Sequence, residues 1–488
     1  MKIEEINSLI HRIDDEERIL NYKLSNGICF WLIVRYEIFT ALLRETIDPA
    51  TLYSEKSNGL AGKLKNKLSY LHYRQKIKRR NPLHIKKHYD CLNICSSVGT
   101  VASNSGFKSR ISGILADTNE LSTLQLIVSN NRQYHARYDG EFCFFDALLT
   151  AKFTQAKTDE PLPDHKHLQE INGFIELLQT YLKGHLSTEY WSSIFRNLQS
   201  CCTKVIHLER TFVQLLDQTT PKIIFIEDGN YGNLAYSTLI KIAKQKKIAT
   251  AEFQHGVFDI AFQYSNKIIS NPVFACHKTD YVLTYGAYFS KFIQSSSINI
   301  QIGSYFMERK KNKIEYARSD TKVMIFITQK AYTDKIIPVL YSALSSLSQP
   351  FKLIIRLHPS DDKERAKYEI FDRFRNTSYS TREDIYSQIA SADYVIGSFS
   401  TLLFEAIYFN KMPLIYKNDL SDYYIPEEIG KRFQNAGELQ KMLEVSPCDN
   451  FETKDNGLYW SSNCQEKFSK FIEGLKLLVD NCLLSPTN

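Results

Sequence analysis

Two short apolar segments in the second half of the chain each stop abruptly at polar residues. Leu353–Leu357 is followed by His358 and Pro359, and Tyr394–Gly397 is followed by Ser398–Thr401. Apolar runs of this length are typical of buried parallel strands. In open α/β sheets, ligands bind at the carboxyl ends of the strands, and a histidine beside hydroxyls that open a helix suits an anion such as phosphate. The pattern predicts a phosphate-type site at one edge of a parallel sheet.

The surrounding sequence alternates between strand and helix patterns. We expect strands at Val323–Ile327, Lys352–Leu357, Tyr394–Gly397 and Pro413–Tyr416, and helices at Asp334–Leu347, Arg382–Ala390 and Leu402–Phe409. We expect the middle helix to be introduced by Ser380 and Thr381. This alternation is typical of a doubly wound parallel sheet. Thr328 and Gln329 follow the first strand, and Glu405 lies in the last helix, so all three are candidates for the same site.

A second set of strand ends lies earlier in the chain. The expected strands at 221–226 and 248–253 are followed by Glu227, Asp228 and Gly229, and by Gln254, His255 and Gly256. A right-handed crossover through one helix places both ends on one edge of a sheet. A carboxylate and an imidazole at one edge are the usual ingredients of general base chemistry, and glycine permits close substrate approach. Two alternatives stay open: Asp228 as a helix N-cap and His255 as a buried core residue.

A chain of 488 residues is too long for one ordinary core, so we expect two domains. The predicted class is α/β, with two Rossmann-like domains and an N-terminal helical extension. The predicted boundaries are 1–85 for a helical and basic extension, 86–306 for the first domain, 307–321 for a charged linker, 322–460 for the second domain and 461–488 for a helix that packs back on the first domain.

Composition excludes several classes of protein. The ten cysteines are scattered without a Cys-x-x-Cys pair, which argues against a zinc site or a disulfide framework. The acidic N-terminus is unlike a signal peptide, and Arg35 and Glu37 interrupt the longest apolar stretch, Ile28–Leu43, so we expect a cytoplasmic protein without a membrane span. A net charge of +7 is mild for this length and does not suggest nucleic acid as a partner.

One segment, Lys63–Arg80, is strongly basic and contains no acidic residue. Leucine, tyrosine and isoleucine residues are interleaved with its charges. An amphipathic basic segment of this kind can bind an anionic membrane surface. The alternative is a solvated basic face or linker.

The strand-end residues resemble those of a known group of enzymes. Glu227-Asp228-Gly229 and His358-Pro359 resemble the acidic-Gly and His-Pro motifs of bacterial sialyltransferases, and Ser398-Phe399-Ser400-Thr401 resembles their serine-rich motif. Gln254-His255-Gly256 and the later Ser-Thr…Glu-Ala helix are similar to a wider group. That group includes capsule and lipopolysaccharide glycosyltransferases, Kdo transferases and CDP-glycerol glycerophosphotransferases. The resemblance covers roughly Lys222–Tyr416.

The resemblance implies a GT-B fold, in which two Rossmann-like domains face each other across a cleft. It also implies inverting, metal-independent transfer of a sugar, with sialic acid and Kdo-like sugars as candidates. The donor would be a CMP-, CDP- or UDP-activated sugar, and the acceptor a capsule or lipopolysaccharide glycan, free or lipid-linked. No further cofactor is implied. The alternatives are a polyol-phosphate transferase of the CDP-glycerol type and a non-catalytic glycan-binding protein.

The resemblance also implies roles for individual residues. Asp228 would be the general base, with Glu227 and His255 as further candidates for acid or base catalysis. His358 would be a further catalytic residue, which hydrogen-bonds the leaving phosphate or protonates it. The remaining nucleotide or phosphate contacts would be Pro359, Ser398, Ser400, Thr401, Glu405, Thr328 and Gln329, with Glu405 on the ribose. The substrate-positioning residues would be Gly229, Gln254, Gly256 and Arg356.

Overall fold

The computed structural model describes residues 2–46, 73–118, 120–129, 134–149, 165–227, 233–257, 275–293, 296–313, 321–329, 332–358, 362–381, 384–445 and 456–484. The chain forms two compact units. The first unit comprises Glu4–Leu42, Lys56–Phe306 and Asn463–Asn488, and the second is built mainly from Met307–Ser462.

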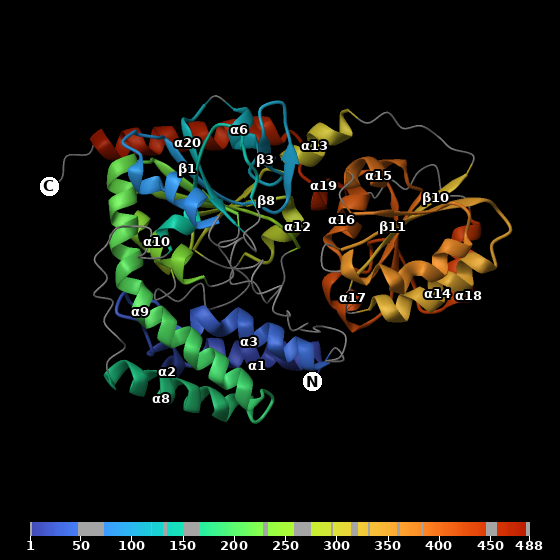
Figure 1. The fold of residues 1–488 in the computed structure, drawn as a ribbon, viewed down its shortest axis with the longest axis horizontal. Helices are drawn as coiled ribbons and strands as arrows, with labels where there is room; N and C mark the ends of the chain where they lie inside the picture. The colour runs from blue at the N-terminus through green and yellow to red at the C-terminus, as the bar shows by residue number, and fades with distance from the viewer. Residues whose placement is uncertain are drawn as a thin grey trace. The chain divides into compact units, whose positions relative to one another are not determined.

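A seven-stranded parallel sheet forms the centre of the first unit (Figure 1). Its strands are β1 (Cys91–Ser96), β4 (Thr123–Val128), β5 (Glu141–Phe144), β6 (Ile223–Ile226), β7 (Ala249–Phe253), β8 (Tyr281–Thr284) and β9 (Ile298–Gln301). Their order across the sheet is β5-β4-β1-β6-β7-β8-β9. The chain runs outward from β1 to β5 and then returns to β6 on the other side of β1. The order therefore reverses between β1 and β6, which is where doubly wound sheets bind ligands.

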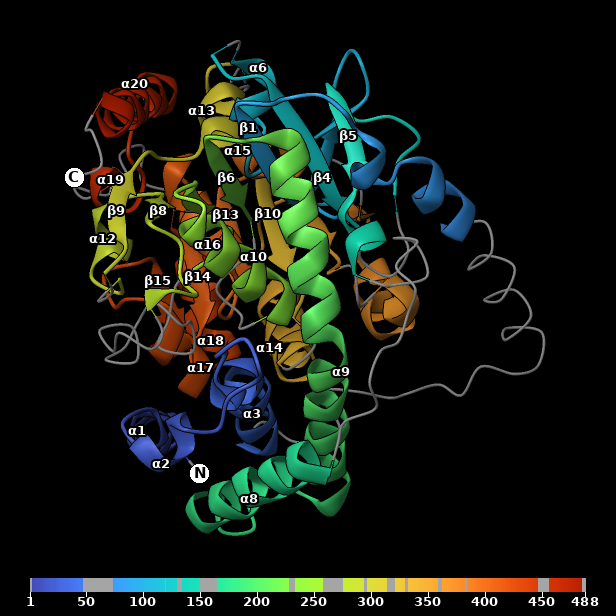
Figure 2. The ribbon, with the colours of Figure 1, turned by 90° about the vertical axis from the view of Figure 1, so that its left-hand side faces the viewer.

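Helices cover both faces of this sheet (Figure 2). The residues of the central strands β6 and β7 are therefore buried on both sides of the sheet. Alternate residues of a strand point to opposite faces. Phe225 and Phe253 pack against Phe468 of α20 (Cys464–Leu484), with ring centroids 5.8 and 6.1 Å away. The other face carries α9 (Thr188–Thr219) and α10 (Leu234–Gln245), and α8 (His165–Leu182) packs on α9. The C-terminal helix thus belongs to the core of the first unit.

The N-terminal extension is helical, with α1 (Ile3–Asp14), α2 (Glu17–Leu20) and α3 (Phe30–Thr46). Its centre is a buried ion pair. The Asp14 carboxylate accepts hydrogen bonds from Arg35 at 2.9 and 3.0 Å and from the indole of Trp31 at 2.7 Å. Arg35 and Trp31 have no exposed surface, and Asp14 is only 3% exposed. The charge that interrupts the apolar stretch is therefore neutralised inside the extension.

The described part of the basic segment, residues 73–80, is mostly helical. Its Tyr73 and Ile77 side chains are buried in a cluster that includes Tyr138 and Phe144, while Lys78 and Arg79 are exposed. The apolar face of this part is thus occupied by the protein's own core. Residues 63–72 lie outside the described part of the chain.

The second unit contains a six-stranded parallel sheet with the order β12-β11-β10-β13-β14-β15. Its strands are β10 (Lys322–Ile327), β11 (Phe351–Arg356), β12 (Thr377–Ser380), β13 (Tyr394–Gly397), β14 (Met412–Tyr416) and β15 (Lys431–Phe433). Its helices are α14 (Thr333–Ser345), η6 (Asp362–Arg373), α15 (Ile385–Ser391), α16 (Thr401–Tyr408), α17 (Asp419–Tyr424), α18 (Ala436–Glu444) and α19 (Asn456–Tyr459). When these strands are numbered along the chain, their order across the sheet is 3-2-1-4-5-6, which is the order of the Rossmann fold. The order reverses between β10 and β13.

The predicted α/β class with two Rossmann-like sheets is confirmed, but several short elements were not predicted. The sequence pattern missed β5, β12, β15 and the hairpin of β2 (Thr100–Ala102) and β3 (Phe107–Ser109). The helix expected from Arg382 begins at Ile385, where Asp384 caps it, and Ser380 ends β12 instead of introducing the helix. The segment predicted as a linker begins within α13 (Tyr305–Lys311), where Met307 is buried. None of the described helices is both long and apolar enough to cross a membrane.

Candidate functional site

The ends of β10 and β13 are joined at the point where the strand order of the second sheet reverses. Gln329 follows β10, and its side-chain oxygen accepts a hydrogen bond from the backbone N–H of Phe399, 2.9 Å away. Phe399 lies in the segment between β13 and α16. The side chain of one strand end therefore fixes the backbone of the other.

His358 is held at the same edge by its backbone. Its N–H donates to the hydroxyl of Thr328 at 2.8 Å, and Thr328 is completely buried. The side chain of His358 is exposed, so the imidazole stands at the surface of the strand edge. Three predicted site residues, Thr328, Gln329 and His358, are thus brought together. Pro359 lies outside the described residues.

The three predicted hydroxyl groups have different surroundings. Ser398 is completely buried and accepts a hydrogen bond from Asn418 at 2.6 Å. Ser400 is the N-cap of α16, where its hydroxyl accepts the N–H of Leu402 at 3.3 Å. Thr401 begins the helix and is partly exposed. Ser400 and Thr401 are accordingly the accessible hydroxyls at this helix start.

Two further predicted residues, Arg356 and Glu405, differ in their partners and burial. The guanidinium of Arg356 donates to Ser380 on the neighbouring strand β12 at 2.7 Å, and that hydroxyl donates to Gln388. Glu405 lies one turn into α16 and is 6% exposed. Arg356 is thus partly exposed but held by Ser380, whereas the Glu405 side chain is buried.

An aromatic group beside the helix start was missed by the sequence reasoning. Phe399 stacks on Tyr424 with ring centroids 5.9 Å apart and an interplanar angle of 24°, and it meets Tyr332 edge-on at 6.0 Å. Tyr332 is buried, whereas Phe399 and Tyr424 are partly exposed. Phe399 stands inside the serine-rich motif, and its position between two hydroxyl residues is the only sequence signal for this group.

In the first unit, Glu227 lies where the order of the first sheet reverses. Its carboxylate accepts the N–H of Ser96 at 3.0 Å, the N–H and hydroxyl of Ser112 at 3.2 and 2.6 Å, and the hydroxyl of Ser109. The residue is 2% exposed. These donors compensate for the loss of water around a buried charge. Such a carboxylate is suited to holding strand ends together. Asp228 and Gly229 lie outside the described residues.

The end of β7 is closed by Gln254, which is buried. Its amide donates to the carbonyl of Gly256 at 2.7 Å and its oxygen accepts the N–H of Tyr285 at 2.8 Å. His255 makes a hydrogen bond to the backbone of Glu227, which brings the ends of β6 and β7 together. Burial lowers the pKa of His255 to about 4, so its imidazole is neutral at pH 7.

No group of three or more His, Cys, Asp or Glu side chains among the described residues is placed to hold a metal ion. Eight cysteines in this part of the chain form no disulfide bond, and Cys276 is exposed. The predicted absence of a metal cofactor stays a prediction.

Comparison with known proteins gave structural likenesses alone. No protein-family model and no curated protein matches the chain. Among solved structures, it is similar to UDP-GlcNAc 2-epimerase from Neisseria meningitidis bound to UDP-GlcNAc, with 12% identity, a TM-score of 0.43, and coverage of 80% of this chain and 100% of that one. It is also similar to the wall teichoic acid polymerase TagF, with 10% identity, a TM-score of 0.43, and coverage of 87% and 100%. The calicheamicin glycosyltransferase CalG4 gives 9% identity, a TM-score of 0.46, and coverage of 79% and 98%.

Proposed function

We propose that this chain is a GT-B-type glycosyltransferase that transfers a sugar from a nucleotide-activated donor with inversion and without a metal ion. One observation carries the proposal: an exposed histidine and two accessible hydroxyls lie around the point where the strand order reverses. Thr328 holds the backbone of His358, and Gln329 holds the segment that leads into Ser400 and Thr401 at the start of α16. Ligands of doubly wound sheets bind at this position, and a helix start favours a phosphate through its N–H groups. The proposal also rests on the motif resemblance in the sequence.

The second unit would bind the donor. His358 would donate a hydrogen bond to the leaving phosphate, and Ser400 and Thr401 would contact it through hydroxyl and backbone N–H groups. The partly exposed rings of Phe399 and Tyr424 lie beside these hydroxyls. An aromatic face next to a phosphate site suits a nucleotide base, because bases stack on aromatic rings.

The first unit would activate the acceptor. Asp228 would remove the proton of the attacking hydroxyl, and the buried carboxylate of Glu227 would fix the strand end that precedes it. His255 is the second candidate base, because its lowered pKa leaves the imidazole neutral and able to accept a proton. General base catalysis contributes about 10²–10⁴-fold to rate, which sets the loss expected when the base is removed.

The substrates we propose are a CMP-, CDP- or UDP-linked sugar and a growing bacterial capsule or lipopolysaccharide glycan. Sialic acid and Kdo-like sugars remain the candidate donors by motif resemblance. Association with the inner face of the bacterial membrane would depend on basic residues such as Lys78 and Arg79, which are exposed. Because Tyr73 and Ile77 are buried in the first unit, contact at residues 73–80 would be electrostatic and would weaken with salt.

The test is nucleotide release from CMP-sialic acid, CMP-Kdo, CDP-glycerol and a panel of UDP-sugars, supplied with lipopolysaccharide or capsule oligosaccharides. We expect release from one nucleotide class, and we expect Asp228→Asn to lower turnover at least about 100-fold while nucleotide binding persists. If His255 is the base, His255→Gln gives that loss and Asp228→Asn does not. Release from CDP-glycerol alone identifies a polyol-phosphate transferase. Binding of a glycan without any release would overturn the enzymatic proposal.

A further inference from the structure

The first turn of α14 is fixed to the strand end where we place the donor phosphate. The hydroxyl of Thr333 accepts the backbone N–H of Gln329 at 2.9 Å and donates to its carbonyl at 2.7 Å. Thr333 is buried, so water does not compete for these bonds. The side chain of the same glutamine accepts the N–H of Phe399. Gln329 therefore joins the start of α14 to the segment that leads into α16.

An aromatic contact brings the same two segments together. Tyr332 directly precedes α14, and its ring meets the ring of Phe399 edge-on at 6.0 Å. Phe399 directly precedes Ser400, the N-cap of α16. The first residues of α14 are therefore neighbours of the hydroxyls proposed to contact the phosphate.

Lys335, the third residue of α14, is an exposed cation beside this contact. Helical side chains lean toward the N-terminus of their helix. The ammonium group of Lys335 accordingly lies over the ring of Tyr332, 5.3 Å from its centre. Because α14 begins soon after the carboxyl end of β10, this orientation carries the charge toward the ligand-binding edge of the sheet.

The charge of Lys335 is not neutralised by an ion pair in the part of the chain that the structure describes. The adjacent carboxylate of Asp334 pairs with Lys367 of η6, 3.3 Å away. Asp419 also lies near Tyr332, yet no ion pair joins it to Lys335 among the described residues. An exposed ammonium group directed toward this edge is available for a phosphate, which lysine binds as a point charge.

We propose that Lys335 binds the second phosphate of a nucleoside diphosphate, so that the donor is a CDP- or UDP-linked compound and not a CMP-linked sugar. His358 and the start of α16 would contact one phosphate, as argued above. Lys335 approaches from a different helix, on the other side of Gln329, and would reach the next anionic group. A CMP-linked sugar has no second phosphate. The inference rests on the proposed function, because it assumes that the donor nucleotide binds at this edge.

The experiment measures the affinity of the full chain for two matched pairs of nucleotides, CMP with CDP and UMP with UDP, by isothermal titration calorimetry. We expect the diphosphate of one base to bind the wild type more tightly than its monophosphate. Lys335→Met keeps most of the side-chain length and removes the charge, so it should weaken that diphosphate at least about tenfold and leave the monophosphate unchanged. Lys335→Arg keeps the charge and should keep the preference.

The matched control is Lys352→Met, the same change at an exposed lysine near the amino end of β11, on the opposite edge of the sheet. It should bind every nucleotide as the wild type does. Equal affinity of the wild type for both members of each pair would overturn the inference. So would a Lys335→Met protein that binds the diphosphate as the wild type does, or that loses both members of a pair equally.

His358→Ala distinguishes a failure of this inference from a failure of the proposed function. If His358→Ala loses nucleotide binding and Lys335→Met does not, the donor site stands and the assignment of a diphosphate donor falls. If the wild type binds none of the four nucleotides, the donor site itself falls, and the role of Lys335 falls with it.

Discussion

The side-chain oxygen of Gln329 accepts the backbone N–H of Phe399 at 2.9 Å, and this bond joins β10 to the start of α16. It crosses the reversal point of the second sheet, where we place the donor phosphate. The bond therefore has two separable consequences. It satisfies a backbone donor, and it places an uncharged oxygen next to the proposed anion site.

The first prediction uses these two consequences. Gln329→Leu removes the acceptor and should lower the free energy of unfolding by about 1 kcal/mol. Gln329→Glu keeps an acceptor oxygen and should retain most of the stability, but its charge should weaken nucleotide binding at least about tenfold. Urea denaturation and nucleotide titration measure the two quantities. If Gln329→Glu binds nucleotide as the wild type does, the phosphate does not lie beside this residue.

The second prediction concerns Glu227. Its carboxylate accepts hydrogen bonds from three serines, and a glutamine in its place would turn an NH₂ group toward at least one donor. We expect Glu227→Gln to lower the free energy of unfolding by about 3 kcal/mol. Ser96→Ala is a control, because the bond from Ser96 to Glu227 comes from its backbone and persists. A Glu227→Gln protein of wild-type stability that has lost turnover would instead identify Glu227 as a catalytic residue.

The third prediction concerns the ion pair in the N-terminal extension. Arg35→Met leaves the Asp14 carboxylate buried without its main cationic partner, so we expect a loss of about 3–5 kcal/mol of unfolding free energy. Adding Asp14→Asn removes the buried charge while retaining an acceptor for Trp31. The double variant should therefore be more stable than Arg35→Met alone. Additive losses in this double-mutant cycle, measured by urea denaturation, would contradict the account.

The fourth prediction is a pH dependence of stability. Burial lowers the pKa values of His255 and His277 to about 4 from an ordinary value of 6.5. Between these values the unfolded chain binds more protons than the folded chain, so stability is full above about pH 6.5 and falls as the pH decreases toward 4. The loss should be on the order of 3 kcal/mol for each of the two histidines.

Urea denaturation across this range measures the effect. His277→Gln keeps a donor toward the carbonyl of Ser237 and should flatten the dependence. The matched surface control is His84→Gln, since His84 is exposed. An unchanged slope in His277→Gln would show that this histidine is not buried in its neutral form.

The sequence predicted the central strands well because these strands are buried on both faces. Ile223–Ile226 and Met324–Ile327 are continuous apolar runs, and this is what parallel strands between two helix layers require. The edge strands β12 and β15 were missed, since Thr377–Ser380 and Lys431–Phe433 contain polar and partly exposed residues. Edge strands are half solvated, so their sequences lack this signal.

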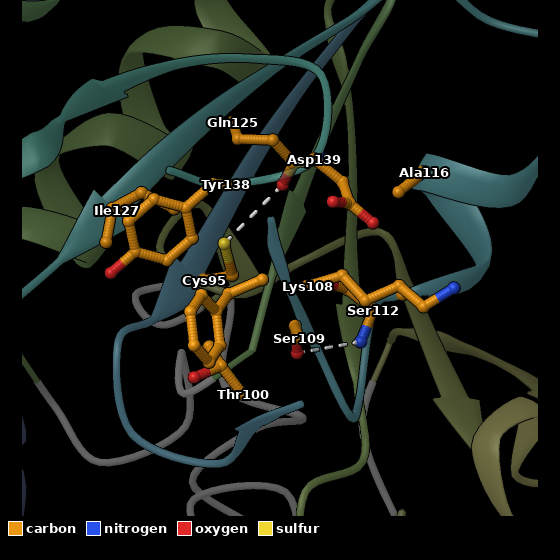
Figure 3. A pocket seen from close by; sticks show the side chains of 12 residues that line it. Cys95, Thr100, Lys108, Ser109, Ser112, Ala116, Gln125, Ile127, Tyr138 and Asp139 are labelled. Carbon is orange, nitrogen blue, oxygen red and sulfur yellow. Dashed lines mark hydrogen bonds between the residues drawn. The ribbon is translucent and has the colours of Figure 1, made fainter. Parts of the chain in front are cut away.

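For the site, the sequence located the strand ends and could not distinguish their structural residues from their accessible ones. The sequence motif does not distinguish Ser398 from Ser400 and Thr401. The folded structure does, because it buries Ser398 against Asn418. Ser109, a partner of Glu227, lies 118 positions away along the chain, and Ser380, the partner of Arg356, lies 24 positions away. No local sequence pattern predicts such contacts. A small pocket at the carboxyl ends of β1 and β4, with room for about one water molecule (Figure 3), was not predicted for the same reason, because its walls include a hairpin that the pattern missed.

The central claim is that the edge formed by β10, β11 and β13 binds the nucleotide of the donor. Its most direct test is a thermal-shift titration of the wild type and of His358→Ala with CMP, CDP and UDP. We predict that one nucleotide stabilises the wild type, as binding to the native state requires, and that His358→Ala loses most of this shift. The claim is contradicted if no nucleotide at millimolar concentration shifts the wild type, or if His358→Ala responds as the wild type does.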